Sequence, residues 1–276
     1  MSIKDITVIV ASFKSGEKIK NCLNSIDRQA KVILVENSDD ITIKKSIESE
    51  FSNVECILTG ANLGYGKANN IGLSKVKTKF ALILNPDTKL DPYTFEYFFK
   101  ATKEIPNFAI IGPSNQGEDN NLEKKIPLSV INVKGYAMFL NLSEFKEIGF
   151  FDEDFFFYFE EIDLCKRIKD KGKKIYIVPD IKIYHDGGQS HEKSINKEME
   201  LSRNWHWMWS TFNYHRKYKG FFISFIIILP KLSSAIIKVV IYSLIFNKEK
   251  RKIYYQRLSG LINAMLGKNS WYRPKV

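Results

Sequence analysis

Residues 80–87 read FALILNPD, five apolar residues followed at once by an amide, a proline and a carboxylate. A continuous apolar run of this length is typical of a strand buried on both faces of a parallel sheet. The same character recurs in two earlier runs, residues 6–11 (ITVIVA) and 32–35, and residues 54–58 (VECIL) are predicted as a further strand. Helix-like segments lie between them, so the order predicts an α/β protein with a doubly wound, mostly parallel sheet flanked by helices.

The segments between and after these runs complete the expected order. Residues 41–50 and 66–75 are predicted as helices, and Asp91 and Pro92 fit the N-cap and first position of another. A helix over residues 160–171 should end at Gly172. Further short strands are expected at residues 110–112, 135–140, 175–178 and 181–184, a short helix at 143–148 and a polar loop at 115–125.

Length and composition exclude several classes of protein. The 276 residues are 44% apolar and 26% charged, which suits a folded core and excludes disorder throughout. The cysteines, Cys22, Cys56 and Cys165, lie far apart without CxxC spacing, so a disulfide scaffold and a cysteine zinc site are excluded. The apolar start without a signal-like segment leads us to expect a cytoplasmic protein.

Positive charge is concentrated at the C-terminal end. Residues 191–276 hold 16 Lys and Arg against 4 Asp and Glu, whereas residues 1–190 are almost balanced. The apolar segment 220–246 is interrupted by Pro230, Lys231 and Lys238, so its pieces are expected to lie in a membrane interface rather than to span it. The expected partner is an anionic membrane surface and not nucleic acid, because a nucleic-acid tail has no need of a segment such as 221–229, in which eight of nine residues are apolar.

We therefore expect two parts, a catalytic domain over residues 1–215 and a basic, amphipathic helical extension over residues 216–276. The alternative for the extension is that its apolar segments pack on the main domain or form a homodimer contact. No internal repeat is present.

Polar loops follow the first four predicted strands and should converge on one edge of the sheet. They contain Ser12, Glu36, the segment from Asn62 through Lys67, and the Asn85-Pro86-Asp87 turn. The glycine-rich loop at 62–70 suits phosphate binding but matches neither GxGxxG nor a Walker loop, and each loop alone fits an ordinary Asx turn. A carboxylate at Asp87 is a hard ligand for Mg²⁺ or Mn²⁺, ions that bridge nucleotide diphosphates.

The helix that begins at Glu160 offers a candidate general base. Glu161 lies three and four residues before Leu164 and Cys165, so it shares the apolar stripe of this helix. Burial would raise the pKa of Glu161 and the helix N-terminus would lower it, a setting for a general base. Asp163 should instead pair with Arg167, and Glu160 should be solvated or support its neighbour.

Histidines offer a further candidate ligand. His185 follows a predicted strand and precedes Asp186, a position open to metal binding or to a purely structural role. His206 and His215 lie in an aromatic region and are expected to pack there.

Together these stretches resemble the inverting family 2 glycosyltransferases with the GT-A fold, and most closely the bacterial rhamnosyltransferase-like branch. The resemblance covers residues 5–191 and is specific in the order and spacing of its motifs. The stretches that carry it are TVIVASF, VILVENSDD, NLGYGKANNIG, LILNPD, KGYAMF, IGFFDEDFFFYFEEIDLCKR and IYHDGGQS.

The resemblance implies roles for these residues. Ser12 and Glu36 would line the base pocket, and Asn62 and Lys67 would approach the nucleotide or its phosphates. Asn85-Pro86-Asp87 resembles the aspartate-x-aspartate motif with its first carboxylate replaced, which leaves Asp87, with His185, to bind Mn²⁺ or Mg²⁺. Glu161 matches the catalytic base, as glutamate instead of aspartate. Contacts to sugar or acceptor are implied for Gly135, Asp152 and Glu160.

The implied activity is transfer of rhamnose or another hexose from a nucleoside-diphosphate donor to a hydroxyl, with inversion. The acceptor would be lipid-linked or a polysaccharide at the inner face of the cell membrane, and the product would feed cell-surface glycan synthesis. Two alternatives are a catalytically silent nucleotide-sugar binding module and a nucleotidyltransferase. The latter would need a phosphate-clamping loop near the first strand, for which residues 14–18 (KSGEK) are a poor match.

Overall fold

The computed structural model describes residues 2–114, 126–187 and 190–275. Short 3-10 helices occupy Ile3–Asp5, Leu142–Phe145 and Lys193–Ile195. The remaining elements follow in chain order: β1 (Ile6–Ser12), α1 (Glu17–Asn24), β2 (Lys31–Glu36), α2 (Ile41–Glu50), β3 (Val54–Leu58), α3 (Tyr65–Ser74), β4 (Phe80–Leu84), β5 (Thr88–Leu90), α4 (Thr94–Glu104), β6 (Phe108–Pro113), β7 (Leu128–Ser129), β8 (Ala137–Asn141), α5 (Glu160–Asp170), β9 (Lys174–Val178), β10 (Ile183–His185), α6 (Asn196–Leu244) and α7 (Lys248–Met265).

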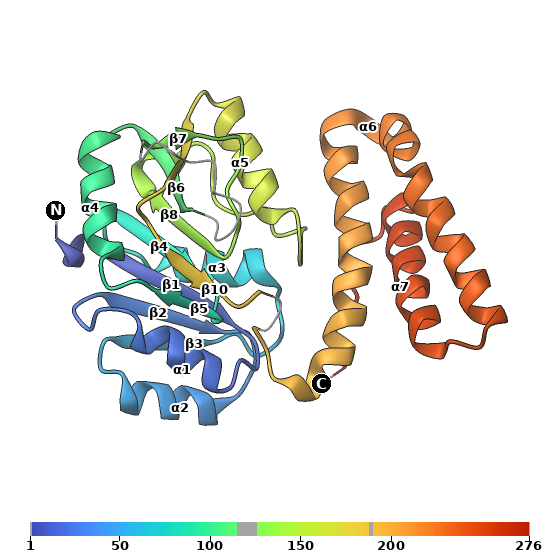
Figure 1. The fold of residues 1–276 in the computed structure, drawn as a ribbon, viewed down its shortest axis with the longest axis horizontal. Coiled ribbons are helices and arrows are strands. Elements are labelled where there is room, and N and C mark those ends of the chain that lie inside the picture. Colours follow the sequence, from blue (N-terminus) through green and yellow to red (C-terminus); the bar gives the residue numbers. More distant parts are fainter. Residues whose placement is uncertain (1, 115–125, 188–189, 276) are drawn as a thin grey trace. The chain divides into compact units, whose positions relative to one another are not determined.

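One sheet organises the first part of the chain. Within the described residues its strand order is β3-β2-β1-β4-β8-β6-β9-β7. Strands β3, β2, β1 and β4 are parallel neighbours, so their carboxyl ends meet at one edge. β8 is antiparallel to both β4 and β6, which interrupts the parallel order in the middle of the sheet. This is the mixed, mostly parallel α/β architecture that the sequence predicts (Figure 1).

Helices cover both faces of this sheet. The alternation of side chains along β1 sends Val8 and Val10 to one face and Ile9 to the other. The first face packs against apolar residues of α1, α2 and α4, and the second against α3 and α5. Both faces of β1 and β4 are therefore buried, which explains why those strands read as continuous apolar runs.

The expected parallel half is confirmed, but the start of α4 differs from the prediction. α4 begins at Thr94 rather than at Asp91 and Pro92. The carboxylate of Asp91 accepts a hydrogen bond from the backbone N–H of Tyr93 at 3.0 Å, so Asp91 closes a turn before the helix. A local capping pattern was read one turn too early because the turn uses the same side-chain chemistry.

The middle section contains pairings that local patterns did not reveal. β10 starts later than the expected strand at 181–184 and pairs antiparallel with β5 in a separate two-stranded sheet. The expected helix at residues 143–148 is only the 3-10 turn Leu142–Phe145. The strand expected at 135–140 is β8, which begins at Ala137 and leaves Gly135 and Tyr136 in the preceding loop. The polar loop at 115–125 lies outside the described residues.

The chain divides into two compact units. The first comprises residues 1–151 and 161–192, and the second comprises residues 152–160 and 193–276. The expected boundary after residue 215 lies inside α6, whereas the division between the units precedes that helix. The second unit has its own core, in which Phe155, Trp205, Phe212, Ile228 and Leu261 are fully buried.

The second unit is helical, as expected, but its main helix is longer than the sequence suggested. α6 bends at Gly220, where φ is +76°, into a first arm (residues 196–219) and a second arm (residues 221–244). The second arm remains helical through Pro230 and Lys231 instead of breaking into short pieces. α6 is thus long and apolar enough to cross a membrane by length and composition, with a mean hydropathy of 2.0 in its most apolar window.

α7 packs directly against the first arm of α6. A side chain at Gly260 would place its Cβ only 2.2 Å from the backbone oxygen of Trp205, so the two helices approach as closely as glycine allows. Trp205 Nε1 donates to Ser259 Oγ at 3.2 Å, and Arg257 Nε donates to Asn204 Oδ1 at 2.6 Å. These contacts hold one turn of α7, residues 257–260, against Asn204 and Trp205 of the first arm.

Candidate functional site

The ends of β1 and β2 hold a buried carboxylate. Glu36 is 1% exposed and accepts hydrogen bonds from Ser12 Oγ, from Ser38 Oγ at 2.8 Å and from the Lys14 backbone N–H at 3.3 Å. Ser12 and Glu36 are direct neighbours in the β1–β2 register. The two residues predicted to line a base pocket are therefore together at the carboxyl edge of the sheet.

The next residue, Asn37, fastens the glycine-rich loop to this edge. Its amide donates to the Gly64 carbonyl at 3.1 Å and accepts from the Leu63 N–H at 2.9 Å. Asn62 accepts from the Gly64 N–H at 3.1 Å, the Asx turn that the sequence left open as an alternative. Lys67 is exposed in the first turn of α3. Asn37 was missed by sequence reasoning, although it stands beside Glu36 in the quoted VILVENSDD stretch.

Asp87 follows β4 and lies beside His185. His185 Nε2 is 3.3 Å from Asp87 Oδ1, and the backbone N–H of Asp186 donates to the Asp87 carbonyl at 3.2 Å. The pairing of β5 with β10 brings these two residues together from distant parts of the chain, since Thr88 lies opposite His185. Asn85 precedes them and donates its backbone N–H to the Tyr136 carbonyl at 2.8 Å.

The donor set at Asp87 and His185 suits a divalent cation. Among the described residues, neither carboxylate oxygen of Asp87 accepts a hydrogen bond, although the side chain is buried, and the amide oxygen of Asn85 is also unsatisfied. Buried carboxylates normally have such partners, so these oxygens fit an additional ligand. Asp87 and Asp186 also line a cavity of about 440 Å³, together with Lys18 and Lys89. Within the described ranges no cluster of three His, Cys, Asp or Glu side chains is present.

Glu161 lies on the core-facing side of the first turn of α5. The neighbouring stripe residues Leu164, Cys165 and Ile168 are fully buried on the sheet. Burial raises the pKa of the Glu161 carboxyl, and hydrogen bonds from the backbone N–H groups of Glu161 and Ile162 only partly oppose this effect. The pKa of Glu161 is raised overall, so desolvation of its carboxylate outweighs the opposing effect of the helix N-terminus.

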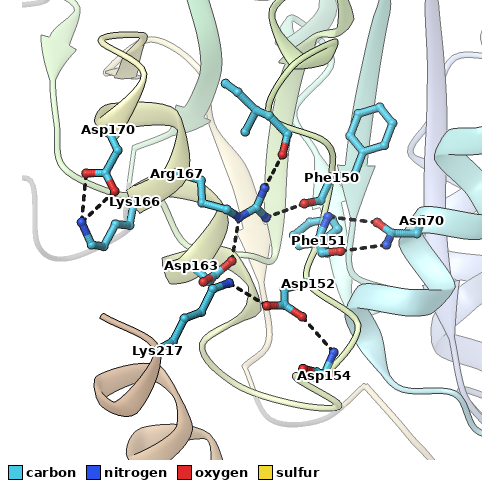
Figure 2. A network of polar contacts seen from close by, with 11 residues as sticks. Asn70, Phe150, Phe151, Asp152, Asp154, Asp163, Lys166, Arg167, Asp170 and Lys217 are labelled. Carbon is cyan, nitrogen blue, oxygen red and sulfur yellow. Dashed lines mark hydrogen bonds and ion pairs between the residues drawn. The ribbon is translucent and has the colours of Figure 1, made fainter. Parts of the chain in front are cut away.

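An ion pair and two backbone contacts hold α5 in place. Arg167 Nε donates to Asp163 Oδ2 at 2.8 Å, as the i, i+4 spacing predicted, and the Asp163 side chain is fully buried. The same guanidinium donates to the carbonyls of Ile148 and Phe150 (Figure 2). Two acidic positions in the first turn of one helix therefore differ: Asp163 is paired with Arg167, whereas Glu161 Oε2 accepts no hydrogen bond from the described residues.

Gly135 and Tyr136 connect the two groups of candidate residues. A Cβ at Gly135 would lie 3.5 Å from the Cβ of Glu161, and the Gly135 carbonyl accepts a hydrogen bond from the Tyr65 hydroxyl. The Tyr136 ring stacks on His185 with 4.5 Å between centroids and 6° between planes. Tyr65 and Tyr136 were not singled out from the sequence, and the only available signal was their place in the NLGYGK and KGYAMF stretches.

Asp152 and Glu160 belong to the second unit. Lys217 Nζ lies 2.6 Å from Asp152 Oδ2, and Asp152 Oδ1 accepts from the Asp154 N–H at 3.0 Å (Figure 2). Glu160 is only 6% exposed, so the expectation that it is solvated is wrong. Phe155 and Phe156 in the aromatic segment before it are buried as well. His206 packs as expected: it is fully buried, which lowers its pKa to about 3.

Comparison with known proteins agrees with this geometry. The family model for glycosyl transferase family 2 matches residues 7–165, which include β1 through the first half of α5. The chain belongs to glycosyl transferase family 2. Within the family it resembles the rhamnosyltransferase-like branch: the rhamnosyltransferase WbbL of Escherichia coli K12 is 24% identical over 249 residues, covering 76% of this chain and 92% of that protein.

Two further similar proteins are named as a hexosyltransferase and a mannosyltransferase. The low-salt glycan biosynthesis hexosyltransferase Agl10 of Haloferax volcanii is 27% identical over 194 residues, covering 60% of this chain and 62% of that protein, so the match spans less than two thirds of its length. The mannosyltransferase PcManGT of Pyrobaculum calidifontis, solved with GDP-Man and Mn²⁺, has a TM-score of 0.63 at 13% identity, over 96% of this chain and 88% of that one. This structural likeness shows the shared fold.

Proposed function

We propose that this protein transfers a sugar, rhamnose or another hexose, from a nucleoside-diphosphate donor to a hydroxyl of a lipid-linked or polysaccharide acceptor in cell-surface glycan synthesis. The supporting observation is that adjacent residues reach both chemical groups: Gly135 lies beside Glu161, and Tyr136 stacks on His185 next to Asp87. A base and a cation site on either side of one loop are what sugar transfer from a diphosphate requires.

In this mechanism Glu161 accepts the proton of the acceptor hydroxyl, whose oxygen then attacks the anomeric carbon. The bond between that carbon and the diphosphate oxygen breaks, and the diphosphate oxygen keeps the electron pair. Because the hydroxyl oxygen attacks from the side opposite the diphosphate, the configuration at the anomeric carbon is inverted. The raised pKa of Glu161 makes its carboxylate a stronger base than an exposed one. Glu36, with Ser12, would hold the nucleoside, and Asn62 and Lys67 would contact its phosphates.

Asp87 and His185 would hold Mn²⁺ or Mg²⁺. Such an ion neutralises charge on the leaving diphosphate when it is bound. Gly135, Asp152 and Glu160 stay candidates for contacts with the sugar or acceptor. The expected location is cytoplasmic, at the inner face of the cell membrane where lipid-linked acceptors reside.

A donor screen tests the proposal directly. The full chain is incubated with Mn²⁺, an acceptor mixture and single nucleoside-diphosphate sugars, and the released nucleotide is identified. We expect release of a nucleoside diphosphate with one donor. Release of pyrophosphate would indicate a nucleotidyltransferase, and donor binding without release from any donor would indicate a silent binding module.

A further inference from the structure

The second arm of α6 carries an apolar face that points away from its own core. The members of this outer face are spaced by 4, 7, 15, 18 and 22 residues from the first, which places them on one side of a helix. All are exposed, from 39% at Leu229 to 82% at Phe222. The outer face comprises Phe222, Ile226, Leu229, Ile237, Val240 and Leu244.

The opposite side of the same arm already makes the contacts that fold the unit. Ser224, Ile228 and Ala235 are buried there, and Ile228 belongs to the core with Trp205 and Leu261. A helix that is apolar on all sides normally needs apolar surroundings on all sides. The outer face is therefore not explained by the packing of α6 against α7.

The positive charges of this arm are turned away from the outer face. Lys238 Nζ donates to the Tyr254 hydroxyl of α7 at 3.2 Å and lies over its ring. Lys231 lines a cavity of about 300 Å³ together with Tyr254 and Arg257. Lysines at the sides of an apolar helix, with their stems along it, suit the boundary between hydrocarbon and lipid head groups.

We propose that the outer face binds an anionic lipid bilayer, with the second arm lying in the plane of the membrane interface. Charge complementarity selects this partner. The exposed residues Ile245 and Phe246 follow the arm, and α7 begins two residues later with the exposed cluster Lys248, Lys250, Arg251 and Lys252. Apolar residues beside a basic cluster are the two components of attachment to anionic lipid. A second copy of the chain would repeat the same positive charge instead of neutralising it.

The packing of the unit favours an in-plane arrangement over a span. The second arm, about 36 Å long, has α7 beside it, and the Lys197–Glu249 ion pair fixes the start of α7 near the start of the first arm. A spanning arm would take α7, with the charge of Arg251, into hydrocarbon unless their contacts broke, and a charged side chain is unfavourable there.

Vesicle binding by the full chain tests the proposal. We expect co-sedimentation with vesicles of phosphatidylglycerol and phosphatidylcholine, less with phosphatidylcholine alone, and weaker binding at high salt. Phe222→Ser with Ile226→Ser should lower the partition constant about tenfold or more. The matched control, Ile41→Ser with Tyr93→Ser, removes two comparably exposed apolar residues of the first unit and should bind as the unchanged protein does.

Spin labels distinguish the orientation of the arm. The native cysteines are buried, so labels will attach to Phe222→Cys, Ser233→Cys and Leu244→Cys at the start, middle and end of the outer face. Equal depths in the bilayer support the in-plane arrangement, and a deep Ser233 position between two shallow ones overturns it. A folded protein that ignores anionic vesicles, or that loses a dimer rather than lipid binding in the serine variant, overturns the lipid partner. None of these readouts depends on sugar transfer.

Discussion

The two compact units place polar and apolar side chains in opposite ways. In the first unit the carboxylates of Glu36, Asp87 and Asp163 are almost completely buried, whereas in the second unit Phe222 and Phe246 are more than four-fifths exposed. Burying a charge and exposing a large apolar side chain both cost free energy. The first unit therefore has unusual buried carboxylates and the second has unusual exposed apolar residues, and we assign a function to each of these features.

The buried carboxylates of the first unit also differ among themselves. Asp163 is neutralised by Arg167 and Glu36 is satisfied by three donors, so both have a structural account. Asp87 and Glu161 have carboxylate oxygens that accept no hydrogen bond from the described residues. Of these four carboxylates, the two with unsatisfied oxygens are therefore the ones to which we assign chemistry.

The largest effect is expected at Glu161. Glu161→Gln should lower turnover by about 10²–10⁴-fold, because the amide cannot accept the hydroxyl proton, while donor binding is retained. Asp170→Asn is the matched control at the exposed end of the same helix and should keep full activity. Turnover and donor binding are measured by nucleotide release and calorimetry. Full turnover by Glu161→Gln together with its loss in Asp163→Asn would reverse the assignment of the base.

The inner and outer sides of the second arm should differ sharply in stability. Ile228→Ala removes a fully buried side chain and should lower the free energy of unfolding by about 3 kcal/mol, whereas the exposed Ile226→Ala should change it by less than about 0.5 kcal/mol. All four tryptophans lie in the second unit, so tryptophan fluorescence during denaturation reports on that unit. Equal effects of the two variants would mean that the outer face is packed against protein.

Activation by Mn²⁺ should require both proposed ligands, Asp87 and His185. Asp87→Ala and His185→Ala should each raise the Mn²⁺ concentration needed for half-maximal turnover about tenfold, in line with loss of a coordinating side chain. Mn²⁺ binding followed by electron paramagnetic resonance gives a second readout that does not require donor or acceptor. Undiminished activity of the unaltered protein in excess chelator would contradict the cation site.

The smallest effect is expected in the pH dependence of activity. Since burial raises the pKa of Glu161 above its usual 4.5, activity should fall on the acid side through that raised value, where the base becomes protonated. The same shift makes the charged form unfavourable in the folded state, so the stability present below pH 4.5 is lost as the pH rises through the folded pKa. Glu161→Gln should therefore unfold at no lower temperature than the unaltered protein at pH 7, as calorimetry can measure. An acid limb at or below 4.5 would argue against a buried base.

Much of the parallel half and of the candidate site could be predicted from local patterns. Apolar runs indicated β1, β2 and β4, the mixed run VECIL indicated β3, and parallel strands necessarily bring their following loops to one edge. The stripe shared with Leu164 pointed to Glu161, and i, i+4 spacing pointed to the Asp163–Arg167 pair. These features follow from the periods of helix and strand, which are properties of neighbouring residues.

The remaining features depended on contacts between distant segments, which local periods do not encode. Antiparallel insertion of β8 placed Gly135 and Tyr136 between the two groups of candidate residues, and pairing of β5 with β10 brought His185 to Asp87. The bend at Gly220 and the packing of Ile228 with Trp205 and Leu261 decided which side of the second arm is buried. The sequence by itself determined which residue types were available and on which helix face or strand end they stood. Only the tertiary structure decided which carboxylates have hydrogen-bond partners and which apolar face stays exposed. Both properties depend on residues that are distant in the sequence and become neighbours only in the folded chain.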